Sequence, residues 1–440
     1  MLLSRDLYGA TISLVRKIFG RFGVRAVTAG FFGRIPSGGR IRAVTPPGCW
    51  GPMITPHFKG GHEVTQPVYV EGARPGDAVA ITIERLRVVS HAAATGTMTL
   101  NPKAFGDDPF VDKRCPNCGA PWPESRPEGT GEEAVRCARC GAEASAFHFE
   151  EGYTVTYDDE YRVALAVDEA NARRIAERAR EEASLPEGSE QHPILLYAPH
   201  TLSGMVARVI PNVGNIGTTP SVDMPDSHNA GDFGASLVGA HHPYALTQEQ
   251  LDAHRTDAHL DCRDVREGAV LLCPVKVEGA GVYMGDAHSV MGRGELALHS
   301  IDVTADVTVR VDVLPGLELE GPILLPRPED LPPIARPFAA EEVTAARALG
   351  ERIGVAPELD VAPLQFIGTG VDLNRATENA IRRAARFLGV SEAEVRNRAT
   401  VTGGVEVSRL PGAVQLTLLL PFRMLEKKGL LDLVRSQYGL

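Results

Sequence analysis

Alternating apolar and polar residues predict a chain built mainly from β-strands. In IDVTADVTVRVDV, residues 301–313, valines at alternate positions share one face, while aspartates, threonines and an arginine occupy the other. This is the pattern of a strand with one buried face. Residues 153–166 and parts of residues 41–100 are also typical of strands, and a tight turn is predicted at residues 73–77. The expected fold class is therefore mainly β.

Helical spacing is limited to a few segments. Residues 168–183 form a charged helix capped by Asp168, and a second helix begins at the N-cap Asp372 and stops at Gly389. The sequence SEAE at 391–394 is a capping box that opens a short helix. The basic N-terminus is expected to form an amphipathic arm packed on its own protein or on a sister subunit, with a membrane-surface helix as the alternative. Its shared helical face would contain Leu7, Leu14, Ile18 and Phe22.

These patterns divide the chain into five parts. A proline-rich stretch after the last clear strand is expected to be a surface connector that leads into a smaller α+β segment. The predicted parts are an amphipathic N-terminal arm (1–40), an N-terminal β part (41–114), a cysteine-bearing insert (115–145), a β-rich core (146–313), and the connector with the α+β C-terminal part (314–440).

Composition and charge exclude several classes of function. The net charge of −11 disfavours binding to nucleic acid. No run reaches the about 18 apolar residues of a membrane span, and the N-terminus lacks the pattern of a signal peptide. Seven cysteines are present, of which Cys49, Cys262 and Cys273 are scattered. An odd, scattered set does not form a disulfide framework, so a cytoplasmic location is expected.

The other four cysteines predict a structural zinc site. They form the sequences CPNC and CARC with eighteen residues between them. Each CxxC turns two thiolates toward one ion, and two such knuckles complete a tetrahedral site, as in a zinc ribbon. Four thiolates leave no open coordination position, so this site would stabilise a loop and not perform catalysis. The alternative is a reduced loop without metal. The predicted ligands are Cys115, Cys118, Cys137 and Cys140.

The segment GVYMGDAHSVMGRGE, residues 281–295, carries a second candidate site. Because residues i and i+2 of a strand face the same way, Asp286 and His288 are expected to project together. A carboxylate oxygen beside an imidazole nitrogen is a natural pair of metal ligands. Gly292 and Gly294 permit a turn that would return Glu295 to the pair.

Two segments upstream strengthen this interpretation. DAHLD offers His259 and Asp261, and HNAGD offers His228 and Asp232. A single Asp-x-His pair is more typical of a hydrogen-bonded surface pair than of a metal site, and that alternative stays open. Three such segments within about seventy residues favour a metal site. Cys49 in PPGCWGP is a weaker candidate, as a thiol nucleophile, because a lone cysteine is typically packed and inert.

Several of these stretches together resemble the acetamidase/formamidase family. The resemblance lies in PVYVEGARPGDAVAITI at 67–83, in residues 260–295 with their GDxH motif, and in the C-terminal segment 366–421. It implies a β-sandwich or β-barrel fold with a small α+β C-terminal part, to which this chain adds the zinc ribbon. It also implies metal-dependent hydrolysis of short linear amides, such as formamide and acetamide, to a carboxylate and ammonia.

The resemblance assigns roles residue by residue. Asp286, His288 and Glu295 fall on the GDxH…E positions, and Asp261 falls on the upstream aspartate. Three positions depart from the family pattern: Met291 stands where the family has glutamine, Arg293 where it has aspartate, and Asp302 where it has glutamate.

The expected mechanism follows from these positions. Asp286, His288 and Asp261 would hold a divalent ion, expected to be zinc with calcium as the alternative. Glu295 would take a proton from water and pass it to the leaving nitrogen. The expected partners are a small amide and further copies of the chain. A non-catalytic binding or assembly protein on the same scaffold, and a hydrolase of a larger amide or carbamate, are the alternatives. Further expected metal ligands are His259, His228 and Asp232.

Overall fold

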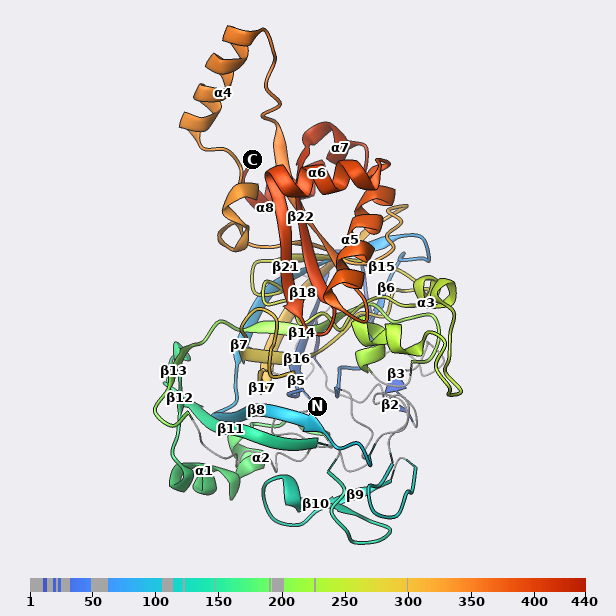
Figure 1. Ribbon diagram of the computed structural model, residues 1–440, viewed down its shortest axis with the longest axis vertical. Coiled ribbons are helices and arrows are strands. Elements are labelled where there is room, and N and C mark those ends of the chain that lie inside the picture. Colours follow the sequence, from blue (N-terminus) through green and yellow to red (C-terminus); the bar gives the residue numbers. More distant parts are fainter. Residues whose placement is uncertain are drawn as a thin grey trace.

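The chain is built mainly from β-sheets, which confirms the predicted fold class (Figure 1). Strands from distant parts of the sequence lie together in the centre of an elongated molecule. The computed structural model describes residues 11–13, 19–20, 23–24, 32–48, 62–104, 114–121, 123–145, 147–189, 191, 202–224, 227–298 and 300–440.

The largest sheet has nine strands in the order β1-β5-β18-β7-β15-β19-β20-β22-β21. Its neighbouring strands are antiparallel except for β1 and β5. The sheet therefore joins strands from both ends of the chain. Its strands are β1 (Thr11–Ser13), β5 (Gly39–Thr45), β7 (Ala78–Val88), β15 (Val270–Pro274), β18 (Ala305–Leu314), β19 (Ile323–Leu325), β20 (Val361–Thr369), β21 (Gly403–Arg409) and β22 (Ala413–Pro421).

A three-stranded antiparallel sheet packs against the large one. It contains β14 (Asn212–Gly217), β16 (Tyr283–Val290) and β17 (Ile301–Val303), with β16 in the middle. Apolar side chains of both sheets belong to one buried cluster, in which Ile216 of β14 joins Val309 of β18. The two sheets thus form the sandwich that the family resemblance implied, because each buries its apolar face against the other.

The predicted strand at 301–313 is two strands in the structure. β17 belongs to the small sheet and β18 to the large one, and they meet at Thr304. The backbone N–H of Thr304 donates to Ser90 Oγ, and its hydroxyl donates to the carbonyl oxygen of Ala183. These bonds lie outside any strand pair, so the chain can change sheets at this residue without leaving its polar groups unpaired.

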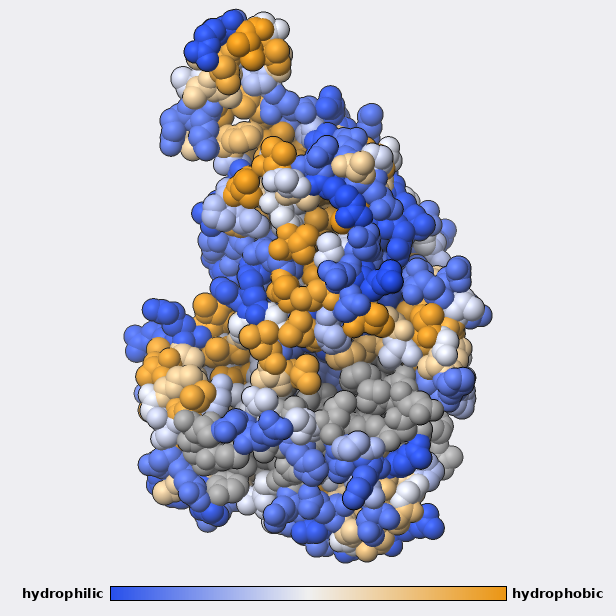
Figure 2. Space-filling model, in the orientation of Figure 1, coloured by the Kyte–Doolittle hydropathy of each residue, from blue (hydrophilic) through white to orange (hydrophobic). Residues whose placement is uncertain are grey.

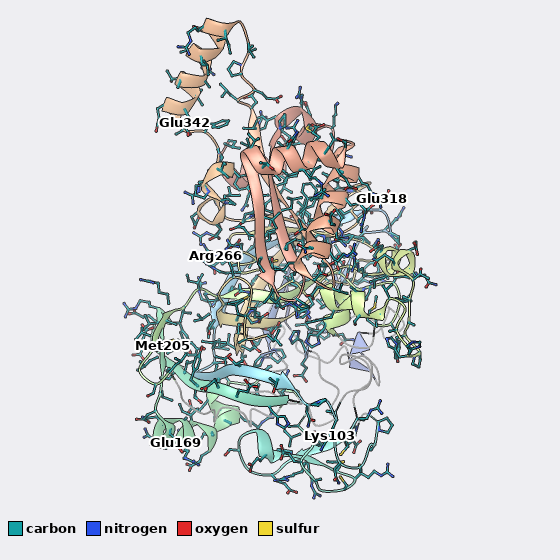
Figure 3. The ribbon with its side chains drawn as sticks, in the orientation of Figure 1. Lys103, Glu169, Met205, Arg266, Glu318 and Glu342 are labelled. Atoms are coloured by element: carbon teal, nitrogen blue, oxygen red, sulfur yellow. The ribbon has the colours of Figure 1, made fainter. Side chains whose placement is uncertain are left out.

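A separate four-stranded sheet, in the order β13-β12-β11-β8, carries the cysteine-bearing insert on the loop between β8 and β11. The predicted helix at 168–183 is two helices, and Asp168 caps the first by accepting from the Asn171 N–H. Figure 3 shows Lys103 and Glu169 at this end of the molecule. The elements are β8 (Ala92–Leu100), β9 (Ser125–Pro127), β10 (Val135–Cys137), β11 (Phe147–Tyr157), β12 (Val163–Ala166), β13 (Val206–Arg208), α1 (Glu169–Ala176) and α2 (Ala179–Glu182).

The C-terminal part is α+β, as predicted. Helix α5 begins after the N-cap Asp372 and ends at Gly389, whose φ of 70° suits glycine. Its alanines face β20 and β22, and Ala380 is fully buried there. Ser391 caps α6 by accepting from the Glu394 N–H. The helices are α5 (Leu373–Leu388), α6 (Glu392–Thr402), α7 (Phe422–Glu426) and α8 (Leu431–Tyr438).

Two segments differ from the predictions. The connector at 314–337 contains β19, which lies inside the large sheet, and it is followed by helix α4 (Ala340–Ile353), which no pattern indicated. α4 projects from the body and exposes apolar side chains, including Leu349 and Ile353 (Figures 1 and 2).

The described residues of the N-terminal arm do not form the expected amphipathic helix. They lie in short strands, of which β1 joins the large sheet, because its backbone pairs with β5. The four apolar residues of the expected helical face lie outside the described residues. No helix in the described ranges is long and apolar enough to cross a membrane. The remaining short elements are β2 (Phe19–Gly20), β3 (Gly23–Val24), β4 (Arg34–Ile35), β6 (Tyr69–Val70) and α3 (Gln248–His254).

Candidate active site

Strand β16 brings Asp286 and His288 together, as the sequence predicts. His288 Nε2 lies 3.2 Å from Asp286 Oδ1, and both side chains are buried. The backbone at Asp286 is not that of a regular strand, because its φ is +54°. Burial alone would lower the pKa of His288, but Asp286 and Asp302 raise it well above its usual value.

The loop before β15 contributes His259 and Asp261. His259 Nε2 lies 2.9 Å from Asp261 Oδ2, and Asp261 Oδ1 lies 3.8 Å from His288 Nε2. A backbone bridge between His259 and Asn215 of β14 fixes the loop beside the small sheet. The predicted convergence of this segment on β16 is therefore found in the structure.

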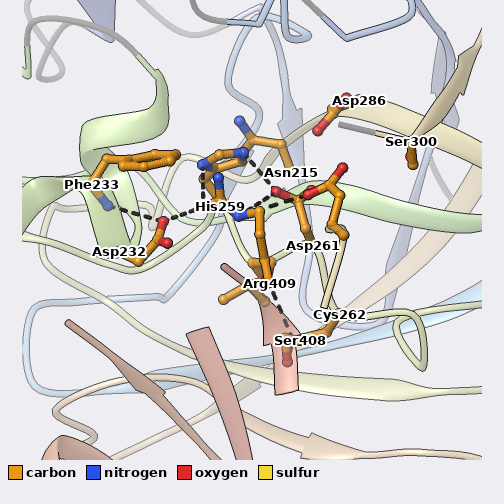
Figure 4. Close-up of polar contacts among 12 residues, drawn as sticks. Asn215, Asp232, Phe233, His259, Asp261, Cys262, Asp286, Ser300, Ser408 and Arg409 are labelled. Carbon is orange, nitrogen blue, oxygen red and sulfur yellow. Dashed lines mark hydrogen bonds and ion pairs between the residues drawn. The ribbon is translucent and has the colours of Figure 1, made fainter. Parts of the chain in front are cut away.

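The HNAGD segment also reaches this region. It spans a 3₁₀ turn at Ser227–Ala230 and the start of another at Asp232–Leu237. The ring centroids of His228 and His259 are 4.8 Å apart. Asp232 instead accepts a hydrogen bond from Arg409, a residue that the sequence analysis did not select (Figure 4).

The glycine turn after β16 returns Glu295 to the site by pairing with β21. Gly294 has a φ of +92°, its N–H donates to Ser408 O, and its carbonyl accepts from the Leu410 N–H. This pairing places Glu295 Oε2 4.0 Å from Arg409 Nε. Ligand atoms of Glu295, Asp261 and His288 lie within 4.8 Å of one another.

The structure adds two donors, His62 and Asp302, to those selected from the sequence. His62 Nε2 lies 3.3 Å from Asp286 Oδ2, and Asp302 Oδ1 lies 3.6 Å from His288 Nε2. The only sequence signal for Asp302 is its place on a family glutamate position. His62 follows two glycines and precedes a bridge between Val64 and β16, which no local pattern reveals.

Arg409 of β21 is the buried cation of this region. Its Nε lies 2.9 Å from Asp261 Oδ2, and its Nη2 lies 3.0 Å from His259 Nδ1. Its guanidinium also stacks 4.4 Å from the Phe233 ring centroid. No sequence pattern indicates this arginine, because its partners lie far away along the chain.

The name "acidic site" is used below for Asp261, Asp286, His288, Glu295 and Asp302. All five side chains are buried. Burial raises the pKa of Asp302 to about 8, and burial followed by repulsion from Asp261 raises the pKa of Glu295 well above its usual value. Asp261 is the exception: burial favours a higher pKa, but His259 and Arg409 hold it well below the usual value. Carboxylates that are buried close together in this way are stabilised by a bound cation.

The acidic site fits a metal ion. Asp261 Oδ1, Asp286 Oδ1 and Glu295 Oε2 are buried and have no hydrogen-bond partner within the described part of the chain. Asp261, Asp286 and Glu295 also have positive φ values, and backbone strain of this kind clusters at functional sites. Carboxylate oxygens with an imidazole nitrogen suit zinc, while a larger share of oxygen donors suits calcium. A neighbouring group of three imidazoles offers further donors: His62, His228 and His259.

A glycine makes room for the acidic site. A Cβ atom added at Gly214 would lie 2.2 Å from Asp261 Oδ1 and 2.7 Å from Asp286 Oδ2. We expect Gly214→Ala to displace both carboxylates and to lower kcat/KM for an amide on the order of 100-fold, because displacements near 1 Å have such effects. Steady-state kinetics with ammonia detection would measure this. The control is Gly292→Ala, where a Cβ meets nothing within 4 Å; equal losses in both variants would contradict the prediction.

The four predicted cysteine ligands form a cluster, as expected. Their sulfur atoms lie within 4.8 Å of one another, and Cys115 Sγ is 3.8 Å from Cys140 Sγ. Both CxxC segments turn back in the same way: Gly119 donates to Cys115 O, and Gly141 donates to Cys137 O. The backbone N–H of Ala142 lowers the pKa of Cys140 to about 6, which favours its thiolate. Cys49, the weaker candidate, lies outside the described residues.

Comparison with known proteins places this geometry in a family. A model of the Acetamidase/Formamidase family matches residues 48–427. A recombinant predicted acetamidase/formamidase from Thermoanaerobacter tengcongensis has a similar structure, with 16% identity, a TM-score of 0.50, and coverage of 96% of this chain and 98% of its own. Acetamidase from Bacillus halodurans has 16% identity, a TM-score of 0.51 and coverage of 95% and 99%. Acetamidase from Yersinia enterocolitica has 14% identity, a TM-score of 0.50 and coverage of 93% and 92%.

At these identities the solved structures establish a shared fold. No curated protein matches the sequence. The family model covers most of the chain and contains the whole acidic site together with His62 and Arg409. The chain therefore belongs to the acetamidase/formamidase family, and by this membership it is an amidase that acts on linear amide C–N bonds.

Proposed function

We propose that the protein is a metal-dependent hydrolase of short linear amides resembling formamide and acetamide, and that it produces a carboxylate and ammonia. The observation that carries this proposal is a group of buried carboxylate oxygens on Asp261, Asp286 and Glu295 that accept no hydrogen bond and lie around His288. Several buried carboxylates held close together are destabilising unless enough cations or protons join them, and Arg409 alone does not balance this group. A cation bound at the acidic site would also lie close to a substrate bound there.

The acidic site would hold the ion through Asp286, His288 and Asp261, with Asp302 close enough to contribute. We propose zinc, with calcium as the alternative. A bound ion of this kind polarises a carbonyl oxygen and lowers the pKa of water. Further ligands are proposed from the adjoining segments: His259, His228 and Asp232.

Glu295 is the proposed proton carrier. Its carboxyl group is buried, and its pKa is raised well above the usual value. A carboxyl group with a raised pKa can both take a proton from water and return it to a leaving nitrogen near neutral pH. Arg409, 4.0 Å away, limits where the Glu295 side chain can lie.

Two of the three departures from the family pattern, Arg293 and Met291, leave the acidic site intact, and the third, Asp302, keeps a carboxylate there. Arg293 Nη2 lies 2.8 Å from Asp264 Oδ2, and its Nη1 lies 3.2 Å from Gln415 Oε1, so the guanidinium joins a different buried polar group. Met291 is buried, and its sulfur accepts from Asn212. These contacts favour an active hydrolase over a binding protein on the same scaffold.

The four-cysteine cluster is proposed to hold a structural zinc ion. It lies on the insert between β8 and β11, whereas the acidic site lies on the small sheet, so the two sites are distinct. The projecting α4, with Leu349 and Ile353 exposed, supports the homo-oligomer expected from the sequence.

Metal removal tests the proposal. We expect gentle chelation to abolish ammonia release from formamide and acetamide, and added zinc to restore it, because the ion proposed at the acidic site polarises the carbonyl oxygen and lowers the pKa of water. The control is Cys140→Ser, which should lose the ribbon metal yet keep turnover per folded chain. Undiminished turnover after the acidic site is emptied, or no turnover on any short amide, would contradict the proposal.

A further inference from the structure

Two asparagines of β14 lie directly behind two imidazoles of the site. Asn212 Nδ2 is 3.1 Å from His288 Nδ1, and Asn215 Nδ2 is 3.4 Å from His62 Nδ1. Both asparagines are fully buried. The Oδ1 atom of each has no hydrogen-bond partner among the described residues. A buried amide with an unused oxygen is unusual, because desolvating that oxygen is unfavourable.

The Nε2 atoms of His288 and His62 both face the carboxylate of Asp286. His288 Nε2 lies 3.2 Å from Asp286 Oδ1, and His62 Nε2 lies 3.3 Å from Asp286 Oδ2. The same arrangement therefore occurs twice: an amide, then an imidazole, then an oxygen of Asp286. Each imidazole is contacted at both nitrogens, so the group at Nδ1 decides which nitrogen carries the proton.

The chemistry of a carboxamide suits this position. An imidazole that binds an ion through Nε2 carries its proton on Nδ1 and needs an acceptor there. Without an ion, an imidazole whose only proton lies on Nε2 and is donated to Asp286 needs a donor at Nδ1 instead, whereas a protonated imidazole needs an acceptor there. A carboxamide supplies either group by turning over, with little change in the positions of its heavy atoms. Because Oδ1 of Asn212 and of Asn215 accepts no hydrogen bond, turning either amide over breaks no hydrogen bond to its oxygen.

His259 has a different environment, which provides a contrast within the same site. Its Nδ1 lies 3.0 Å from Nη2 of Arg409, and a guanidinium can only donate. The His259 proton therefore stays on Nε2, 2.9 Å from Asp261 Oδ2. His259 could therefore bind an ion through Nε2 only after Arg409 moves away from Nδ1, whereas His288 and His62 can present Nε2 with the guanidinium in place.

We propose that Asn212 and Asn215 are positioning residues that orient His288 and His62 with their Nε2 lone pairs toward a metal ion. The inference rests on the proposed function, since it assigns the ligand atoms of that ion. Met291 contributes by contacting the Asn212 amide only through a thioether, 3.4 Å away. A thioether is a weak acceptor, so it leaves the amide able to turn.

Zinc affinity of the full chain tests the inference, measured by titration after gentle chelation with the four-cysteine cluster still filled. We expect Asn212→Leu to weaken binding at the acidic site about 10- to 100-fold, as the loss of a ligand's hydrogen-bond partner typically does. Asn212→Asp should bind at least as tightly as the wild type, because a carboxylate accepts from Nδ1–H. The same pair of substitutions at Asn215 gives an independent comparison if a variant at residue 212 does not fold.

The control is Asn379→Leu, which removes a buried asparagine whose Oδ1 accepts from the Thr369 N–H, away from the imidazoles. It should leave zinc affinity unchanged. Wild-type affinity in Asn212→Leu, or equal weakening in the leucine and aspartate variants, would overturn the inference and leave the proposed function standing. A wild-type protein that binds only the ribbon metal would overturn both.

Discussion

Asp286→Ala is expected to reduce amide hydrolysis by on the order of 1,000-fold or more, equivalent to about 4 kcal/mol of transition-state stabilisation. The reason is geometric: this single carboxylate lies between His288 on one side and His62 on the other, so both imidazoles lose their shared partner. Loss of the ion should accompany loss of turnover. Ammonia release and the metal content of the same preparation would measure the two effects together.

A matched control exists in the same sandwich. Asp306 of β18 is also largely buried, but its carboxylate is paired with Arg42 at 2.8 Å and lies outside the acidic site. Asp306→Ala should keep both metal and turnover, and its effect on the free energy of unfolding should be on the order of 1–3 kcal/mol, because the carboxylate is buried while Arg42 and Arg85 are exposed. A variant at residue 286 that kept full activity would contradict the site assignment.

Arg383→Met is expected to lower the free energy of unfolding by about 3–5 kcal/mol, because it removes the main partner of a buried carboxylate. Arg383 of α5 pairs with Asp257, and both are buried. Arg255 Nε remains 3.5 Å from Asp257, so the lower end of that range is favoured. For a chain of this length the loss corresponds to a fall of roughly 3 °C in the midpoint of thermal unfolding, which calorimetry would measure.

The neighbouring ion pair of Arg386 with Glu320 provides the control. It lies three residues further along the same helix, is exposed, and has a separation of 2.7 Å. Arg386→Met should change the free energy of unfolding by less than about 1 kcal/mol. The double variant Asp257→Asn/Arg383→Met should recover much of the loss, and a failure to recover would point to lost packing instead of an unpaired charge.

The same pair predicts a dependence on pH. Burial favours a higher pKa for Asp257, but Arg255 and Arg383 outweigh it and hold the pKa below the usual value. The folded state therefore binds this proton less readily than the unfolded state. The stabilisation is fully present above the unfolded pKa of about 3.9 and is lost as the pH falls below it. The difference between wild type and Arg383→Met should accordingly narrow below about pH 4.

Features with a local cause were predictable from the sequence. The caps of α5 at Asp372 and Gly389 depend on bonds within one or two turns, so the residue types reveal them. The alternation of buried and less buried residues in β18 and the clustering of the two CxxC segments also depend on residues that are near one another in the sequence. Asp286, His288 and Asp261 could be selected because each lies in a short segment that concentrates donors.

Features that depend on packing between distant segments were not predictable. His62 and Arg409 join the site from nearly opposite ends of the chain, and each looks like an ordinary surface residue in the sequence. Asn212 and Asn215 lie in a strand that is buried at every position, so no alternation marks them. Proline suggested a surface connector at 314–337, but the short β19 between the prolines is fully inside the large sheet.

The position of Arg409 on β21, near the end of the chain, has a consequence for biosynthesis. Because a ribosome makes a protein from its N-terminus, His62 is synthesised well before β21. The site around His62 therefore stays incomplete until Arg409 has also been synthesised. Contacts between such distant residues form slowly, since the intervening chain must first be brought together. A nascent chain that ends before β21 would carry all the carboxylates of the acidic site but lack the Arg409 guanidinium that pairs with Asp261. Enzyme activity should therefore appear only after β21 has been synthesised.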